Sequence, residues 1–302
     1  MKCISTCGGF SSQIHRSVRM ICTWACLISV LAALLQVGNA QDLMPEEFSE
    51  PSVEGAAPVT VLPVSPENTS AHDKGFDLEG WRKLVPDLAA EQKKTWLFPF
   101  SVRGKHLKYT GIIIGATAGL VALDGYSARY TQKKRAEYFT GFNKVFSSPN
   151  TGLSTIYIPL GLYGIGLVRR DIYAQRTFLL AGQAVLNSEI LTSVMKDITR
   201  RNNPADIPSG GNFTDTWFKK KPKAYIAGTG SFPSGHTIAA FSVATVYAER
   251  YPGRWQKILA YGLASVVGFS RVSLESHYVS EVALGAVLGK IFGHYVVHRQ
   301  NP

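Results

Sequence analysis

The chain has 302 residues, enough for one large domain or two small ones, and a formal net charge of +11 at pH 7. This excess of basic residues suits an anionic partner, such as a phosphorylated substrate or an acidic lipid headgroup. A nucleic-acid partner is not expected, because the sequence has no helix-turn-helix, zinc-finger or RNA-binding signature. All of the cysteines fall in the N-terminal segment, and they are Cys3, Cys7, Cys22 and Cys26. The rest of the chain therefore offers no disulfide and no cysteine ligand for a metal.

Residues 1–40 have the pattern of a secretory signal peptide. They contain Lys2, Arg16 and Arg19 but no acidic residue, and an apolar run from about residue 20 is followed by small residues up to Ala40. A basic start, an apolar stretch and small residues before a cleavage point direct a chain to export. We therefore expect a cleaved leader and a protein of the cell envelope, either periplasmic or membrane-associated. An uncleaved membrane anchor is the alternative.

Residues 41–80 differ in composition from the rest of the chain. They hold nine acidic residues, one lysine and five prolines, with no sustained apolar period. Such a composition cannot bury enough apolar surface to offset the entropy of ordering. We expect a disordered acidic linker here.

Residues 81–302 hold the expected folded domain, which has 28 basic and 12 acidic residues. No run of alternating apolar residues bounded by hairpin turns indicates strands. Apolar segments separated by polar connections occur near residues 110–123, 152–168, 177–195, 237–248, 258–269 and 282–297. The expected fold is all-α, a bundle of about six core helices.

The apolar segments do not clearly predict membrane spans. A spanning helix needs about 20 mostly apolar residues. Most of these segments are shorter, and several contain polar residues, such as Gln183, Asn187 and Lys290. We expect a helical bundle associated with a membrane, with an integral membrane protein as the alternative. The cluster of Lys219, Lys220 and Lys221 is interpreted as a solvated loop.

Two histidines, His294 and His298, are four residues apart near the C-terminus, but no partner ligand for them is evident in the sequence. We therefore predict no metal requirement.

Three short segments carry the chemistry. They are Lys196 to Pro204 (KDITRRNNP), Ser231 to Thr237 (SFPSGHT) and Ser270 to Glu281 (SRVSLESHYVSE). Together they supply cations that can hold a phosphate, two histidines and a carboxylate. A metal-free phosphoryl-transfer site needs such groups: charge for the phosphate, a nucleophile, and an acid for the leaving group.

The second segment predicts an anion site at a helix N-terminus. Its Pro-Ser-Gly-His sequence precedes an apolar run, so backbone N–H groups and the helix dipole should face the anion. Gly235 allows close approach of a phosphate, and Ser234 adds a hydroxyl donor. His236 titrates near neutrality and can protonate a leaving oxygen. The alternative is a serine that caps a helix beside an ordinary histidine.

The third segment spaces His277 and Glu281 four residues apart, which on a helix places them on one face within reach of a hydrogen bond. A carboxylate on one imidazole nitrogen fixes the tautomer and leaves the other nitrogen free to attack. Arg271 and Lys196 fit as phosphate ligands, Arg as a planar fork and Lys as a point charge.

These segments resemble the signatures of the type 2 phosphatidic acid phosphatase (PAP2) and vanadium haloperoxidase superfamily, which are Lys-x6-Arg-Pro, Pro-Ser-Gly-His and Ser-Arg-x5-His-x3-Asp. The resemblance covers about residues 105–298. It implies that His277 is the nucleophile that forms a phosphohistidine, that His236 is the acid, and that no metal is needed. It also implies a phosphorylated substrate, with a lipid as the expected kind, and a protein at a membrane.

Two positions depart from these signatures. Asn203 stands where the superfamily has its second arginine, and Glu281 stands where it has aspartate. A neutral amide can donate to a phosphate oxygen but cannot stabilise developing charge as a cation does. The extra methylene of Glu281 shifts its carboxylate by about one bond length, and about 1 Å of misplacement can lower a rate by about 100-fold. Arg201 is a candidate auxiliary cation, although its spacing is wrong for a simple exchange with Asn203.

Three functions are compatible with the resemblance. The first is a metal-independent phosphatase acting on phosphate monoesters or diphosphates. The second is a haloperoxidase that holds vanadate in the same pocket. The third is a catalytically impaired relative that keeps only an anion-binding or structural role.

Overall fold

The computed structural model describes residues 75–101, 103–147, 160–161, 163–221 and 228–299. The predicted signal peptide (1–40) and all but the last residues of the predicted linker (41–80) lie outside these ranges, as does most of the apolar segment 152–168. Every regular element in the described residues is a helix, which confirms the all-α prediction.

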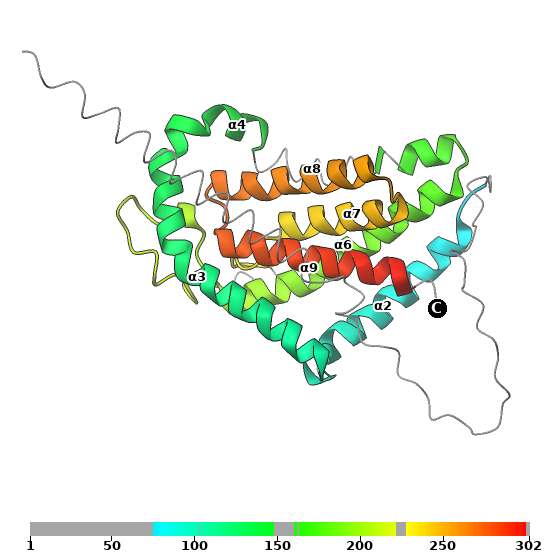
Figure 1. Ribbon diagram of the computed structural model, residues 1–302, viewed down its shortest axis with the longest axis horizontal. Coiled ribbons are helices and arrows are strands. Elements are labelled where there is room, and N and C mark those ends of the chain that lie inside the picture. The colour runs from blue at the N-terminus through cyan, green and yellow to red at the C-terminus, as the bar shows by residue number, and fades with distance from the viewer. Residues whose placement is uncertain (1–74, 102, 148–159, 162, 222–227, 300–302) are drawn as a thin grey trace, which may run out of the picture. The chain divides into compact units, whose positions relative to one another are not determined.

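The elements follow one another along the chain as long helices joined by irregular connections (Figure 1). They are α2 (Leu78–Ser101), α3 (Lys105–Tyr138), α4 (Thr140–Val145), α6 (Ile172–Thr199), the short 3-10 helix η2 (Pro204–Asp206), α7 (Gly235–Arg250), α8 (Arg254–Ser273) and α9 (Val279–Arg299). Five of the six predicted apolar segments lie within α3, α6, α7, α8 and α9. Helix α2 was not among them, and it begins at Leu78, inside the last residues of the predicted linker.

Helix α7 lies at the centre of the core, packed against α6, α8 and α9 (Figure 1). Helix α9 approaches α7 closely because Gly285, Gly289 and Gly293 recur every four residues on the face that meets it. A Cβ atom on Gly289 would lie 2.5 Å from the carbonyl oxygen of Ile238 on α7. Helices α7 and α9 run parallel, since Gly285 contacts the start of α7 and Gly293 contacts Thr245 further along it. Two helix N-termini are thereby brought side by side.

Helix α2 explains the polar residues within α6. Glu91 of α2 is only 2% exposed, and it accepts a hydrogen bond from Gln183 at 2.8 Å and another from Asn187. Arg299 of α9 adds an ion pair to the same carboxylate at 3.2 Å. Buried polar side chains need such partners. The polar residues of α6 are therefore the binding surface for α2.

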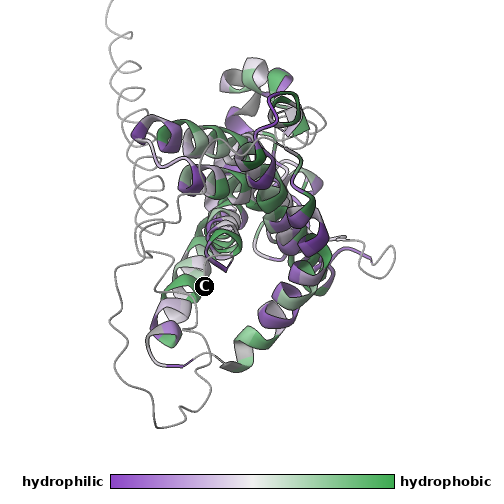
Figure 2. Cartoon of the chain, turned by 90° about the vertical axis from the view of Figure 1, so that its right-hand side faces the viewer, coloured by the Kyte–Doolittle hydropathy of each residue, from purple (hydrophilic) through white to green (hydrophobic). Residues whose placement is uncertain are grey.

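Two helices leave large apolar side chains on the outside. Exposed apolar residues on α3 include Leu107, Ile114 and Leu123, and those on α8 include Trp255 and Leu259; the hydropathy colouring of Figure 2 traces apolar residues along the helices. By length and composition, two described segments are long and apolar enough to cross a membrane, His106–Lys134 and Ile172–Asp206. In the first of them only 17% of the apolar window is buried. That helix therefore has an apolar surface that is not used in the core.

Candidate active site

The three sequence segments meet where α6 and α8 end and where α7 and α9 begin. The C-terminal half of α6 supplies Lys196, and the connection after it supplies Arg201 and Asn203. The N-terminus of α7 supplies Ser234, Gly235 and His236, the last turn of α8 supplies Arg271, and the start of α9 supplies Glu281. His277 lies in the turn between α8 and α9.

Helix α7 begins at Gly235, in the segment where the sequence predicts a helix N-terminus, and Ser234 is its N-cap residue. The Ser234 side chain does not cap the helix but shares a hydrogen bond with Thr237 at 2.9 Å. A Cβ atom on Gly235 would meet the Glu189 carboxylate at 3.2 Å and the Lys196 ammonium at 3.5 Å. Glycine is therefore needed for Lys196 to lie against the helix N-terminus. Glu189, which faces the same point, was not among the predicted site residues.

His277 and Glu281 form the expected pair, with Nδ1 of His277 2.8 Å from Oε2 of Glu281. The pair is not on one helix face, because α9 begins at Val279, two residues after His277. The turn is held instead by Arg271, whose carbonyl oxygen accepts the N–H group of His277 at 3.1 Å. Glu275 completes this turn in the left-handed region, with φ of 57°.

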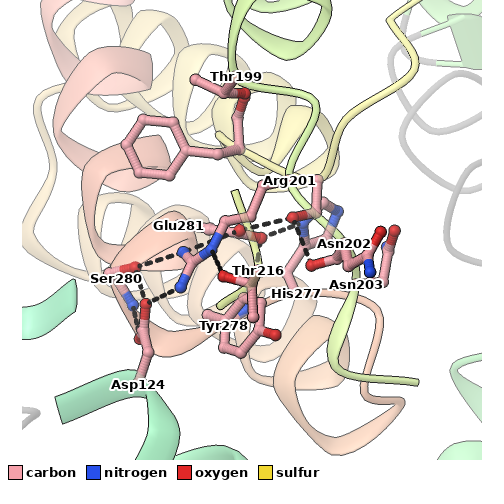
Figure 3. A network of polar contacts seen from close by, with 12 residues as sticks. Asp124, Thr199, Arg201, Asn202, Asn203, Thr216, His277, Tyr278, Ser280 and Glu281 are labelled. Atoms are coloured by element: carbon pink, nitrogen blue, oxygen red, sulfur yellow. Dashed lines mark hydrogen bonds and ion pairs between the residues drawn. The ribbon is translucent and has the colours of Figure 1, made fainter. Parts of the chain in front are cut away.

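Glu281 is fully buried and its carboxylate is held at both oxygens (Figure 3). Oε1 accepts hydrogen bonds from Arg201 at 3.1 Å and from Ser231 at 2.7 Å. Oε2 accepts from the backbone N–H group of Tyr278 at 3.3 Å in addition to its bond with His277. The glutamate is thus fixed in a position that serves His277.

Arg201 is the centre of this buried network rather than a free cation. Its guanidinium donates to Asp124 at 2.8 Å and to Thr216 at 3.1 Å (Figure 3). Its Cζ also lies over the ring of Trp217, 4.4 Å from the centroid, and over that of Tyr278, at 3.8 Å. Its exposed fraction is 1%. The predicted auxiliary role is therefore indirect: Arg201 holds Glu281. Asp124 could not be identified from the motifs, because α3 carries none of them.

Asn203 has both ends of its amide engaged. Its Nδ2 donates to the carbonyl oxygen of Ser276, and its Oδ1 accepts from the ammonium of Lys220. Lys220 also forms an ion pair with Asp206 at 3.0 Å. It lies near enough to Lys196 for the two positive charges to repel. The interpretation of Lys220 as a solvated loop residue was therefore wrong, and a cation stands beside the position where the family arginine is missing.

Arg271 is also fully buried. Its Nη2 donates to the carbonyl oxygen of Phe146 at 3.1 Å and to Ser270 at 3.0 Å. Burial lowers the pKa of its guanidinium to about 10, which leaves it positively charged at neutral pH.

The positive charges of the pocket act on its two histidines. Burial, followed by the charges of Arg271, His277 and Lys196, lowers the pKa of His236 to about 4. Burial also lowers the pKa of His277, while the hydrogen bond and charge of Glu281 oppose this effect. Both shifts favour the neutral form of the imidazole, and the cations Lys196 and Arg271 beside the histidines favour an anion.

Comparisons with known proteins identify a matching family. Residues 177–302 match the model of the PAP2 superfamily. Phosphatases of the superfamily work without a metal ion, in agreement with the expectation of no cofactor.

Two curated relatives match short stretches. A lipid A 1-phosphatase from Porphyromonas gingivalis is 40% identical over 65 residues, which is 21% of this chain and 15% of that protein. An acid phosphatase from Zymomonas mobilis is 35% identical over 69 residues, 23% of this chain and 25% of that protein. The chain thus spans a quarter or less of the length of these relatives.

Among solved structures, a transmembrane PAP2 type phosphatidylglycerolphosphate phosphatase from Bacillus subtilis matches with a TM-score of 0.39 and 19% identity. The match covers 72% of this chain and 94% of that one.

Proposed function

We propose that the protein is a metal-independent phosphatase that hydrolyses phosphate monoesters or diphosphates through a phosphohistidine. The observation that supports this proposal best is the buried His277–Glu281 pair, which lies near the cations Lys196 and Arg271 and near His236. The pair has the arrangement of an activated nucleophile: a carboxylate holds one imidazole nitrogen, and the other nitrogen is available for attack.

In the first step Lys196, Arg271 and the N–H groups at the start of α7 hold the phosphate oxygens. Nε2 of His277 attacks phosphorus, the bond from phosphorus to the ester oxygen breaks, and His236 gives its proton to that oxygen. In the second step His236 takes a proton from water as the water attacks the phosphohistidine. Inorganic phosphate leaves and His277 is regenerated. Glu281 stabilises the positive charge that develops on His277.

The longer carboxylate of Glu281 is compatible with this role. Its hydrogen bond to His277 has an ordinary length of 2.8 Å. Arg201 and Ser231 hold the same carboxylate from behind. We infer that the surrounding network has adjusted to glutamate, and that this departure tunes the site rather than impairs it.

Lys220 compensates for the second departure. Its ammonium is bonded to Asn203, the residue at the family arginine position, and its charge reaches Lys196. The backbone N–H groups of Lys219 and Lys220 both donate to the carbonyl oxygen of Arg200, at 3.0 Å each, which ties this loop to the end of α6. A cation placed there can meet the charge that builds on the equatorial phosphate oxygens. We infer that Lys220 is a phosphate-binding residue.

A lipid phosphate is the substrate class that suits this protein best. Exposed apolar residues on α3 and α8 offer a surface for a membrane, next to a domain with 28 basic and 12 acidic residues. One curated relative is a lipid A 1-phosphatase by name. We place the protein at a membrane of the cell envelope, after export directed by residues 1–40.

The test is phosphate release from a lipid phosphate by the purified full chain in detergent, with EDTA present. We expect turnover by the parent protein and none by His277→Ala. Quenching a reaction with radiolabelled substrate in alkaline denaturant should yield a phosphohistidine, whose P–N bond is stable to base and labile to acid, and which should be absent from His277→Ala. Equal phosphate release by both proteins would overturn the proposal. Halide oxidation with added vanadate and peroxide, run on the same preparation, would point instead to the haloperoxidase alternative.

A further inference from the structure

A group of two histidines and a glutamate lies at the far end of α7 and α9 from the phosphate pocket. Glu249 is in the last turn of α7, and His294 and His298 are near the end of α9. Glu249 follows Gly235 by 14 residues, which at a rise of about 1.5 Å per residue places the group about 20 Å along α7 from the candidate active site. It has no part in the proposed reaction.

The three side chains converge on one point. Nδ1 of His294 lies 2.7 Å from Oε1 of Glu249, and Nδ1 of His298 lies 3.4 Å from Oε2. The two imidazole rings are 3.9 Å apart between centroids. One nitrogen or oxygen atom from each of the three residues lies within 4.8 Å of the other two. A spacing of four residues places both histidines on the same face of α9, and α7 supplies the third side chain.

We propose that Glu249, His294 and His298 form a binding site for a divalent transition metal, with zinc as the best fit. Imidazole and carboxylate are ligands that zinc accepts, whereas magnesium and calcium prefer oxygen alone. Zinc–nitrogen bonds of about 2.0–2.1 Å place tetrahedral ligand atoms about 3.3 Å apart. The observed separations of 2.7 and 3.4 Å lie on either side of this value, so small side-chain shifts suffice. Water would complete the coordination.

A buried carboxylate oxygen of the group has no hydrogen-bond partner, and this supports a bound cation. Oε2 of Glu249 is buried and accepts no hydrogen bond, although buried polar atoms nearly always have a partner. His294 is only 5% exposed. The side chain of His298 is 45% exposed, so an ion can enter from that side.

Three features oppose the metal and set the conditions of the test. Nδ1 of His294 and Oε1 of Glu249 share a hydrogen bond, and a bound ion would displace the proton between them. Nδ1 of His298 lies 3.1 Å from the carbonyl oxygen of His294, and metal binding would replace that contact, with the His298 proton on Nε2. Lys290 and Tyr261 also lie near enough to Glu249 to sense its charge. The ammonium of Lys290 competes with a bound cation for the same carboxylate.

The experiment measures binding of Zn²⁺ to the purified full chain by competition with a chromophoric chelator, and of Co²⁺ by its visible absorption. All samples carry serine in place of Cys3, Cys7, Cys22 and Cys26, because thiols would bind both ions. We expect one Zn²⁺ per chain, a Co²⁺ spectrum of a tetrahedral site, and a rise in Tm with either ion. Glu249→Gln and His298→Gln should weaken binding by at least about tenfold, since even loss of an outer partner of a ligand weakens affinity by about 10–100-fold.

Matched controls separate this site from general effects and from the proposed reaction. His106→Gln removes a histidine on α3 and should leave the affinity unchanged. His298→Gln changes a half-exposed side chain, so it should fold normally, and its phosphatase activity should equal that of the parent with or without EDTA. Failure of the parent to bind Zn²⁺ at micromolar concentrations would overturn the site, as would binding of equal strength by His298→Gln.

Discussion

The two sides of His277 differ in how their charges are balanced. Behind it, Arg201 is matched by Glu281 and Asp124 in a fully buried network in which each charge has a partner at 2.8 to 3.1 Å (Figure 3). In front of it, Lys196 lies against the N-terminus of α7 beside Glu189, and the charges of Lys196 and Arg271 act on His236. Lys220, which is paired with Asp206, adds a positive charge near Lys196. A balanced network fixes geometry, whereas a pocket with excess positive charge is completed by an anion.

This comparison also explains how the chain departs from its superfamily at two positions. The departure at Glu281 lies in the network, where buried partners hold the longer side chain in position. The departure at Asn203 lies in the pocket and is met by a half-buried lysine from a connecting loop. Changes to the network should therefore affect stability and geometry, while changes to the pocket should affect phosphate binding and charge.

The largest effect is expected for Arg201→Met. Removing the guanidinium leaves Asp124 and Glu281 as buried carboxylates without a cation, and breaking such a pair destabilises a protein by about 3–5 kcal/mol. Denaturant or thermal unfolding should show this loss, together with loss of phosphatase activity. Arg254→Met, an exposed arginine at the start of α8, is the matched control and should change stability by less than about 0.5 kcal/mol. Similar stabilities for the two variants would mean that the network is not a structural unit.

The pH profile tests the pocket. His236 must carry a proton to act as the acid, and its pKa is lowered to about 4. Above that value the protonated fraction falls about tenfold per pH unit, so kcat/KM should decline as pH rises towards neutrality. A bound phosphate adds negative charge beside the imidazole and raises its pKa. The decline of kcat should therefore occur at higher pH than that of kcat/KM.

Two substrates separate this effect from ionisation of the phosphate itself, which titrates near pH 6 in an alkyl phosphate. The electron-withdrawing ring of p-nitrophenyl phosphate lowers this pKa, so each kcat/KM value is first corrected for the ionised fraction of its own substrate. An alkyl phosphate needs a proton on its leaving oxygen, whereas p-nitrophenyl phosphate hardly does. The kcat/KM value for the alkyl phosphate, divided by that for p-nitrophenyl phosphate, should fall as pH rises. A ratio that stays constant over the whole range would remove His236 from the role of acid.

Glu281→Asp tests whether the network has adjusted to glutamate. Aspartate restores the family residue but withdraws the carboxylate from Arg201, Ser231 and His277 by about one bond length, and about 1 Å of misplacement can lower a rate by about 100-fold. We expect kcat/KM to fall by about 10–100-fold, with KM changed less than kcat. Glu281→Gln keeps the length of the side chain and removes its charge, and we expect it to lower kcat/KM further. An increase in activity with aspartate would show that glutamate impairs the enzyme.

The sequence was informative where local pattern decides structure. The apolar periods predicted most of the core helices, and the Pro-Ser-Gly-His segment predicted the helix N-terminus that begins α7. The resemblance to the PAP2 superfamily, based on three signatures, is confirmed by the family match over residues 177–302. The spacing of His277 and Glu281 predicted their hydrogen bond, although a turn rather than a helix provides it.

The sequence was uninformative where contacts join distant segments. Helix α2 is rich in charge, and its place depends on Glu91 meeting Gln183 and Asn187, more than 90 residues away along the chain. The orientation of the Lys220 side chain likewise depends on its contacts with Asn203 and Asp206. A run of three lysines indicates a solvent-exposed loop unless those partners are known. Tertiary contacts, not propensity, decide such positions.

The smallest effect is expected at Lys220, because its side chain is more exposed to solvent than the buried groups around His277. Removing one preorganised oxyanion donor lowers kcat by about 100–1,000-fold. Lys220 is 26% exposed in its side chain and is already paired with Asp206, so we expect Lys220→Ala to lower kcat/KM by about tenfold. Lys219→Ala is the matched control on the same loop, because Lys219 pairs with Asp215 away from Asn203 and is 42% exposed. It should retain the parent activity.

Restoring the family arginine sharpens this test. In the parent, Asn203→Arg places a second cation where Lys220 already acts, so the gain should be small. In the Lys220→Ala background the same change should recover most of the lost activity, and the two substitutions should be strongly non-additive because they supply one charge to one phosphate. If Lys220→Ala matches Lys219→Ala, or if Asn203→Arg raises kcat/KM equally in both backgrounds, then Lys220 does not serve the phosphate. Asn203 would then be an uncompensated loss in the pocket, while the network behind His277 would remain intact.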